Sequence, residues 1–114
     1  MKKVIREGKV AVVISDNYDW SSFCVLNESK EVMMFHPLIV EMVEAGASLT
    51  DELKATLLEQ VNSKDSKKEL DYRLDTPFDN ELRIVWLPIG TKFIVLSNEM
   101  NEFILKEDDL DFTA

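Results

Sequence analysis

The sequence predicts an α+β fold, in which two consecutive helices pack on one face of a small, predominantly antiparallel sheet or half-open barrel. Three observations support this prediction. Short β-prone runs open the chain, residues 37–61 then repeat apolar side chains at helical spacing, and residues 82–106 return to strand-like runs. Because the connections between strands are too short for a crossover, the strands are expected to be antiparallel.

Length and composition indicate one domain spanning residues 1–114. The chain has 46% hydrophobic and 31% charged residues, an ordinary composition for a globular domain of this size. A chain of this length buries about two thirds of its unfolded surface, enough for a core without disulfides or metal. Cys24 is the one cysteine, so no intramolecular disulfide forms.

The opening segment predicts a β-hairpin formed by residues 3–6 and 9–15. Gly8 lies between the two runs and can supply the positive φ of a tight turn. The run VAVVI at 10–14 is apolar on both alternating faces, so its strand is expected to be central and covered on both sides. Residues 23–26 are expected to form a third strand after a polar loop.

The next segment predicts two helices. Pro37 suits the first turn of the first helix, which His36 is expected to cap and Gly46 to end in the left-handed conformation. Ser48 or Thr50 can cap the second helix. The apolar stripes expected to face the core are Leu38, Met42 and Ala45 in the first helix, and Leu53, Leu57, Leu58 and Val61 in the second.

The following segment returns to short elements. Residues 62–69 have no periodicity and are expected to form a mobile loop. A short strand at 70–74 and a turn at 75–81 are expected to follow. The last predicted element is a three-stranded meander with strands at 82–88, 91–97 and 101–106.

Charge and hydropathy limit the partners and the compartment. Residues 36–114 hold eight basic and 17 acidic side chains, a difference of nine that accounts for the entire net charge of −9. Such a field repels phosphate backbones and anionic membranes, so nucleic acid and membranes are not expected partners. Without a signal peptide or a membrane-spanning apolar run, a cytoplasmic location is expected. The acidic tail at 107–114 is expected to be anchored, if at all, by Leu110 and Phe112.

Recognisable catalytic motifs are missing from the sequence. It contains no glycine-rich phosphate loop, nucleophile elbow, zinc-protease motif or paired-cysteine motif. His36 is the one histidine and is better explained as a helix cap, and Cys24 is expected to be a small buried apolar residue. We therefore expect no enzymatic activity, no metal and no cofactor. An enzyme using Asp16 and Asp19, one of them with a raised pKa, is a weaker alternative.

The stretch ISDNYDWSSF at 14–23 holds the candidate binding residues, which are Asp16, Tyr18, Asp19 and Trp20. Flat aromatic faces lie there beside hydrogen-bonding groups, a combination typical of ligand and partner sites. The ordinary alternative is that the Asp and Asn side chains bond to the local backbone. A calcium loop is disfavoured, because the positions of its glycine and bidentate glutamate hold Ser21 and Asn27.

Two acidic segments, 69–81 and 107–114, provide the other candidate surface. Most simply they form a solvated face. The sharper hypothesis is an acidic decoy that imitates nucleic acid and occupies a basic groove on another protein. Strand edges that pair across a two-fold axis also make a homo-oligomer plausible.

Three stretches carry a resemblance to a family of small uncharacterised proteins encoded by tailed bacteriophages: VIREGKVAVVIS, MMFHPLIVEMVEAG and LRIVWLPIGTKF. The likeness covers most of the chain. This chain retains Trp20 but lacks the glycines of the family's loop after the first strands, and it has His36 where the family tends to have Asp.

The resemblance implies a virus-encoded accessory protein acting in the cytoplasm of an infected bacterium. It supplies no activity. By analogy with other small phage proteins without catalytic motifs, we expect a non-enzymatic protein that binds a host factor, either a protein or a small ligand. Countering a host defence is one role that such binding could serve. The loop at 16–20 is expected to form part of the contact surface.

Overall fold

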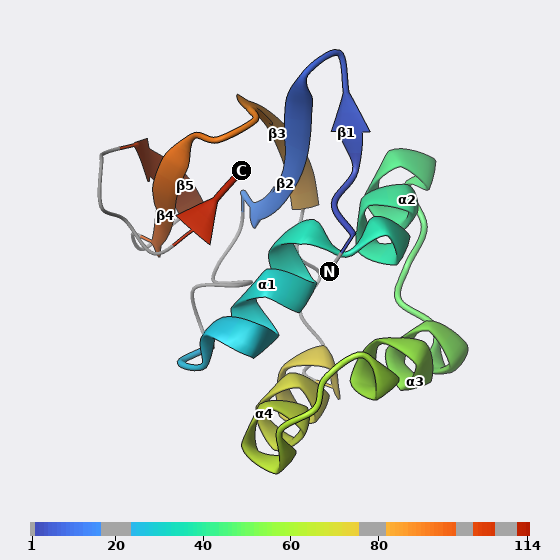
Figure 1. Cartoon of the computed structure of the whole chain (residues 1–114). Helices are drawn as coiled ribbons and strands as arrows, with labels where there is room; N and C mark the ends of the chain where they lie inside the picture. Colours follow the sequence, from blue (N-terminus) through green and yellow to red (C-terminus); the bar gives the residue numbers. More distant parts are fainter. Residues whose placement is uncertain (1, 17–23, 76–81, 98–101, 107–111) are drawn as a thin grey trace.

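The computed structural model describes residues 2–16, 24–75, 82–97, 102–106 and 112–114 (Figure 1). The helices within this part of the chain are α1 (Asn27–Phe35), α2 (Pro37–Ala45), α3 (Asp51–Glu59) and α4 (Lys64–Asp75). The strands are β1 (Ile5–Arg6), β2 (Lys9–Ser15), β3 (Leu82–Pro88), β4 (Lys92–Ser97), β5 (Glu102–Lys106) and β6 (Phe112–Thr113). All strand pairs are antiparallel, so the predicted α+β class is confirmed.

The predicted hairpin is confirmed by the turn between β1 and β2. Arg6 pairs with Lys9, which leaves Glu7 and Gly8 as a two-residue turn. Both turn residues have positive φ, 53° at Glu7 and 74° at Gly8. A two-residue turn of this kind matches the twist of the flanking strands, and glycine adopts its second position without strain.

Strand β2 is the middle strand of the first sheet, in the order β1-β2-β3, and it is buried on both faces as predicted. Its two faces belong to different core clusters. Ala11 and Val13 pack with residues of the four helices, whereas the alternate residues Val10, Val12 and Ile14 pack with the second sheet and the end of α1. One short strand therefore lies between a helical layer and a sheet layer.

The helical layer contains four helices, where the sequence predicted two. Helix α1 was missed, and residues Cys24–Leu26, placed in a third strand by the prediction, are not in a strand. Residue 23 lies outside the described residues. Helix α1 has a weak sequence signal, because its N-cap residue is Leu26, whose side chain makes no hydrogen bond to the first turn. Its buried apolar side chains are confined to its last turn: Val32, Met33, Met34 and Phe35.

Helix α4 replaces the mobile loop and the short strand predicted over 62–74, and both predictions are wrong. Three side chains spaced four residues apart, Ser66, Leu70 and Leu74, form its buried stripe. Spacing of four residues keeps them on one face of a helix. Only two of the three are apolar, so the stripe was hidden within a mostly charged segment.

The predicted caps of α2 and α3 are confirmed. His36 separates α1 from α2, and its Nδ1 accepts a hydrogen bond from the backbone N–H of Leu38 at 3.1 Å. Gly46 ends α2 with a φ of 64°. Thr50 caps α3, with its Oγ1 accepting from the N–H of Leu53 at 3.1 Å. No helix in the described part of the chain combines the length and the apolar character needed to cross a membrane.

The three strands of the predicted meander exist, and β4 pairs with β5 as predicted, but the predicted pairing of β3 with β4 is wrong. Strand β3 pairs with β2, whereas β4 lies between β5 and β6 in a second sheet. The chain turns this corner at residues 88–91, where the N–H of Ile89 donates to Gly8 O at 3.1 Å and the N–H of Gly90 donates to Ala114 O at 2.7 Å. Contacts with both the hairpin turn and the last residue thus direct β4 away from β3.

The end of the chain belongs to the core. Phe112 is buried, as predicted, and its ring centroid lies 5.9 Å from that of Phe93 in β4. Phe35 of α1 packs edge-on against Phe93 from the other side, at 6.0 Å. These three rings join α1 to β4, the middle strand of the second sheet, and to its edge strand β6. Leu110 lies outside the described residues.

Candidate functional site

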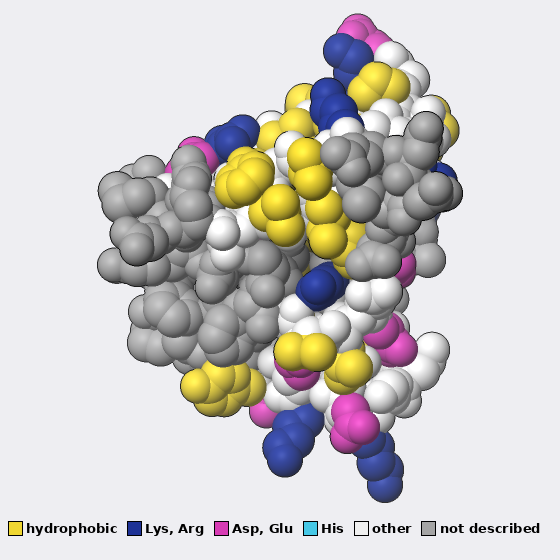
Figure 2. All heavy atoms as spheres, turned by 90° about the vertical axis from the view of Figure 1, so that its left-hand side faces the viewer, with side chains coloured by type: hydrophobic (Ala, Val, Ile, Leu, Met, Phe, Trp, Pro, Cys, Tyr) yellow, Lys and Arg dark blue, Asp and Glu magenta, His cyan; other side chains and the backbone are white. Residues whose placement is uncertain are grey.

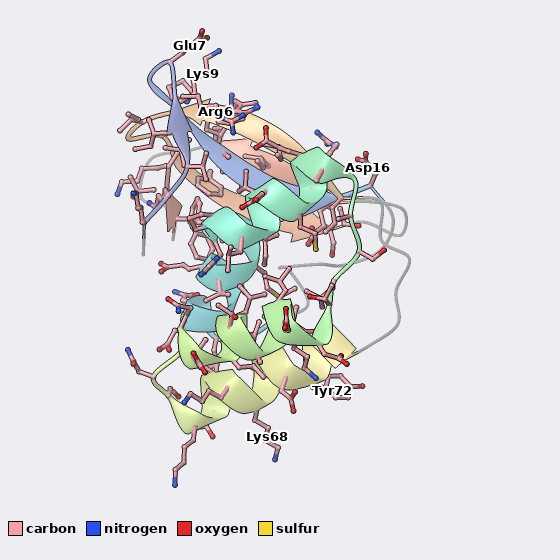
Figure 3. All side chains as sticks on the ribbon, turned by 90° about the vertical axis from the view of Figure 1, so that its right-hand side faces the viewer. Arg6, Glu7, Lys9, Asp16, Lys68 and Tyr72 are labelled. Atoms are coloured by element: carbon pink, nitrogen blue, oxygen red, sulfur yellow. The ribbon has the colours of Figure 1, made fainter. Side chains whose placement is uncertain are left out.

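Asp16 is the one candidate binding residue that the structure describes. It follows directly after β2, at the opposite end of that strand from the turn that carries Glu7 (Figure 3). Its carboxylate is about two-fifths exposed and forms an ion pair with Nε of Arg83 in β3, at 2.5 Å. Tyr18, Asp19 and Trp20, the other candidates, lie outside the described residues.

Directly before Asp16, the chain is fixed by a buried carboxylate. The backbone N–H of Ser15 donates to Oε1 of Glu102 at 2.9 Å, and both residues are fully buried. Glu102 opens β5 in the second sheet, so this bond ties β5 to the end of β2. A buried carboxylate is retained only where hydrogen bonds or charges compensate its lost hydration.

A second carboxylate holds the chain directly before helix α1. Glu69 of α4 accepts hydrogen bonds from the N–H groups of Val25, at 3.0 Å, and Leu26, at 3.1 Å. Helix α1 begins at the next residue, and its own N-cap side chain makes no such bond. Glu69 therefore caps α1 from another helix and places negative charge at the positive end of the helix dipole.

Together these contacts fix both ends of the segment that contains the candidate loop. We call Asp16, Glu69 and Glu102 the carboxylate anchors. They bind groups of β2, β3 and the start of α1 from positions far apart in the sequence. Sequence reasoning identified only Asp16. Glu69 was assigned to an acidic surface, and Glu102 is a single acid at the start of an apolar strand, which gives no signal by itself.

The described contacts do not join Cys24 to His36 as a catalytic pair would be joined. Cys24 is buried, and its Sγ lies 3.4 Å from Sδ of Met33. His36 is buried as well and uses Nδ1 as the cap of α2. Among the described residues there is also no group of three or more His, Cys, Asp or Glu that could hold a metal ion.

The acidic segment 69–81 has fewer free carboxylates than its sequence indicates. Glu69 caps α1, and Asp71 forms an ion pair with the mostly buried Lys54 of α3, at 2.8 Å. The rest of that segment after residue 75, and residues 107–111 of the tail, lie outside the described residues. Within the described part, Glu69 thus serves helix capping and Asp71 serves helix packing.

The structure also reveals an apolar surface that the sequence did not predict. Four side chains on the outward face of β4 and β5 form it: Ile94, Leu96, Phe103 and Leu105. Cross-strand pairing places Ile94 beside Leu105 and Leu96 beside Phe103. Phe103 is 40% exposed and Leu105 is 38% exposed. Figure 2 shows hydrophobic side chains gathered on the face of the molecule that carries this sheet. We call this surface the outer apolar face.

No protein-family model matches the chain, and no curated protein or solved structure is significantly similar to it.

Proposed function

We propose that this chain is a non-enzymatic binding protein whose contact surface includes the loop at 16–20. In this proposal it is encoded by a tailed bacteriophage and binds a factor of the infected bacterium. One observation carries the proposal: the carboxylate anchors fix the chain immediately before and after the candidate loop. Loops held by a rigid scaffold are the usual carriers of binding function.

The anchors lower the conformational cost of binding in this proposal. Association is opposed by the conformational freedom lost at the interface, about 0.5–1.5 kcal/mol for each immobilised side chain. A loop whose two ends are already fixed loses less freedom than a free one. One of these ends is fixed by Glu102, whose carboxylate is buried although burial of such a group costs free energy.

The decoy hypothesis receives less support from the contacts. It requires carboxylates in a row, free to occupy the phosphate positions of a basic groove. In the described part of the acidic segment, Glu69 and Asp71 instead bind other groups of the same chain. An anchored loop is the better candidate for the contact surface.

A loop variant tests the proposal. Replacing Asp16, Asp19 and Trp20 together with alanine is expected to abolish capture of the host factor from a lysate of the host bacterium. The melting temperature is expected to change little, because the exposed Asp16–Arg83 ion pair contributes at most about 1 kcal/mol. Mass spectrometry of retained proteins and small molecules, compared with wild type, gives the result.

A matched control separates loop chemistry from surface charge. The loop variant removes two acids and one large apolar side chain, and replacing Glu41, Glu59 and Ile89 with alanine removes the same kinds of side chain from exposed positions elsewhere. This control variant is expected to capture what the wild type captures. If the loop variant captures the same molecules as the control, or fails to fold, the contact surface lies elsewhere and the proposal is wrong.

A further inference from the structure

Strand β5 lies at the edge of the second sheet, whose order is β5-β4-β6. It pairs with β4 on one side, and no other described strand pairs with it on the other side. The unpaired N–H and C=O groups of an edge strand are a template for another strand. Proteins commonly protect such edges with charges or proline, but the middle of β5 reads Phe103-Ile104-Leu105.

We propose that two copies of this chain associate through β5, paired antiparallel about a two-fold axis that passes beside Ile104. This inference goes beyond the proposed function and does not depend on the loop at 16–20. It rests on the sequence of β5, which is self-complementary when it is read against itself in the antiparallel direction.

Self-pairing centred on Ile104 is the register in which Phe103, Ile104 and Leu105 pair with the same three residues of the second copy. Phe103 then lies opposite Leu105 of the second copy, and Leu105 opposite Phe103. Cross-strand aromatic–aliphatic pairs contribute roughly 0.2–1 kcal/mol each. Both pairs lie on the outer apolar face, which becomes continuous across the two copies. A shift of two residues leaves two residues of each strand without a partner in the other β5.

Charge does not oppose this register. The position opposite Lys106 of each copy is Glu102, so two lysines do not face each other across the axis. Because Glu102 is buried against Ser15, the contact is centred on Phe103–Leu105 rather than on this pair. Each copy carries a net charge of −9, and the two repel each other at long range. The association is therefore weak at low salt and strengthens as salt screens the repulsion.

Sedimentation velocity tests the association. The wild type is expected to shift from monomer to dimer between about 1 and 500 μM protein, with more dimer in high salt than in low salt. Leu105→Lys adds a charge at the middle of the edge and is expected to remain monomeric. Ile89→Lys is the matched control, since Ile89 is 57% exposed but lies outside β5, and it is expected to dimerise like wild type.

A cysteine variant tests the register. Ile104→Cys places two thiols across the axis, where opposed Cα atoms lie about 4.5–5.5 Å apart, within the range of a disulfide. Oxidation is expected to yield a covalent dimer. Leu96→Cys in β4 is the control, because its two copies lie about 14 Å apart, three strand spacings, and should not cross-link. The native Cys24 is buried and cannot interfere.

Two results would overturn the proposal. One is a wild type that stays monomeric over the whole concentration range at both salt concentrations. The other is a dimer that forms equally well in Leu105→Lys and Ile89→Lys, or that cross-links through Leu96→Cys and not through Ile104→Cys. Neither result bears on the loop, whose variant is judged by capture from lysate.

Discussion

The buried carboxylate of Glu102 accepts a hydrogen bond from the backbone N–H of Ser15 and thereby joins the second sheet to the end of the central strand. The two residues are 87 positions apart in the sequence and both are fully buried. In a site without access to water, a substitution that removes one hydrogen-bonding partner lowers the free energy of unfolding, because the other partner stays buried without a bond. An N–H left without an acceptor loses its hydration and gains nothing in return.

Glu102→Ala is therefore expected to lower the free energy of unfolding by about 2–3 kcal/mol, since it removes the acceptor and leaves the Ser15 N–H buried. Glu102→Gln keeps an acceptor oxygen at the same place and is expected to lose clearly less. Urea unfolding of the three proteins measures the difference. Equal losses in the two variants would show that the hydrogen bond to Ser15 does not determine the cost.

Removal of the Glu69 carboxylate is expected to weaken the start of α1. Glu69→Ala leaves the N–H groups of Val25 and Leu26 without their acceptor, and loss of a helix cap costs about 0.5–2 kcal/mol. Amide hydrogen exchange is expected to become faster in the first turn of α1. Lys68→Ala, an exposed change on the same helix, is the control and should leave that exchange rate unchanged. Uniform acceleration along the whole chain would contradict the capping role.

Features that depend on neighbouring residues could be predicted from the sequence. The turn at Glu7-Gly8, the double burial of β2 and the caps at His36 and Thr50 each follow from a few adjacent side chains. The corner at residues 88–91 could not, because a short turn fits a hairpin and a change of sheet equally well. The bond from the Gly90 N–H to Ala114 O, across 24 residues, is part of what distinguishes them.

The candidate site shows the same division. Asp16 was identified because acids and aromatic residues gather after an apolar strand, but its partner Arg83 lies 67 residues away. Glu69 looked like part of an acidic surface, since composition does not show which carboxylate faces a helix N-terminus. Sequence patterns thus located one end of the anchored segment, and only the fold brought together the groups that hold it.

Helix α4 provides a test of the largest difference from the predicted fold. The predicted fold placed Leu70 at the start of a short strand, whereas in the structure it lies on the buried stripe of α4 and is fully buried in the helical core cluster. Leu70→Ala is expected to cost about 2–5 kcal/mol in unfolding free energy, through lost burial and the cavity that it leaves. Tyr72→Ala, at a position 65% exposed on the same helix, is expected to cost far less. Similar, small losses in both variants would contradict the packing of α4 into the core through Leu70.

His36 is expected to make stability depend on pH. Burial lowers the pKa of His36 below its ordinary value of 6.5, so the unfolded chain binds a proton more readily than the folded one. Stability from this residue is complete above pH 6.5 and is lost as the pH falls toward the lowered value, by at most about 1.4 kcal/mol per pH unit. Protonation also removes the Nδ1 acceptor that caps α2.

His36→Asn separates this titration from the cap. Asparagine is a good N-cap and does not titrate, so the variant should keep much of the stability at pH 7.5 and lose less than wild type at pH 5.5. Urea unfolding at the two pH values measures both changes, and the range stays above the ordinary pKa of carboxylates. An identical loss in wild type and His36→Asn would assign the pH dependence to other groups. A loss confined to wild type would show that the neutral imidazole is required in the fold.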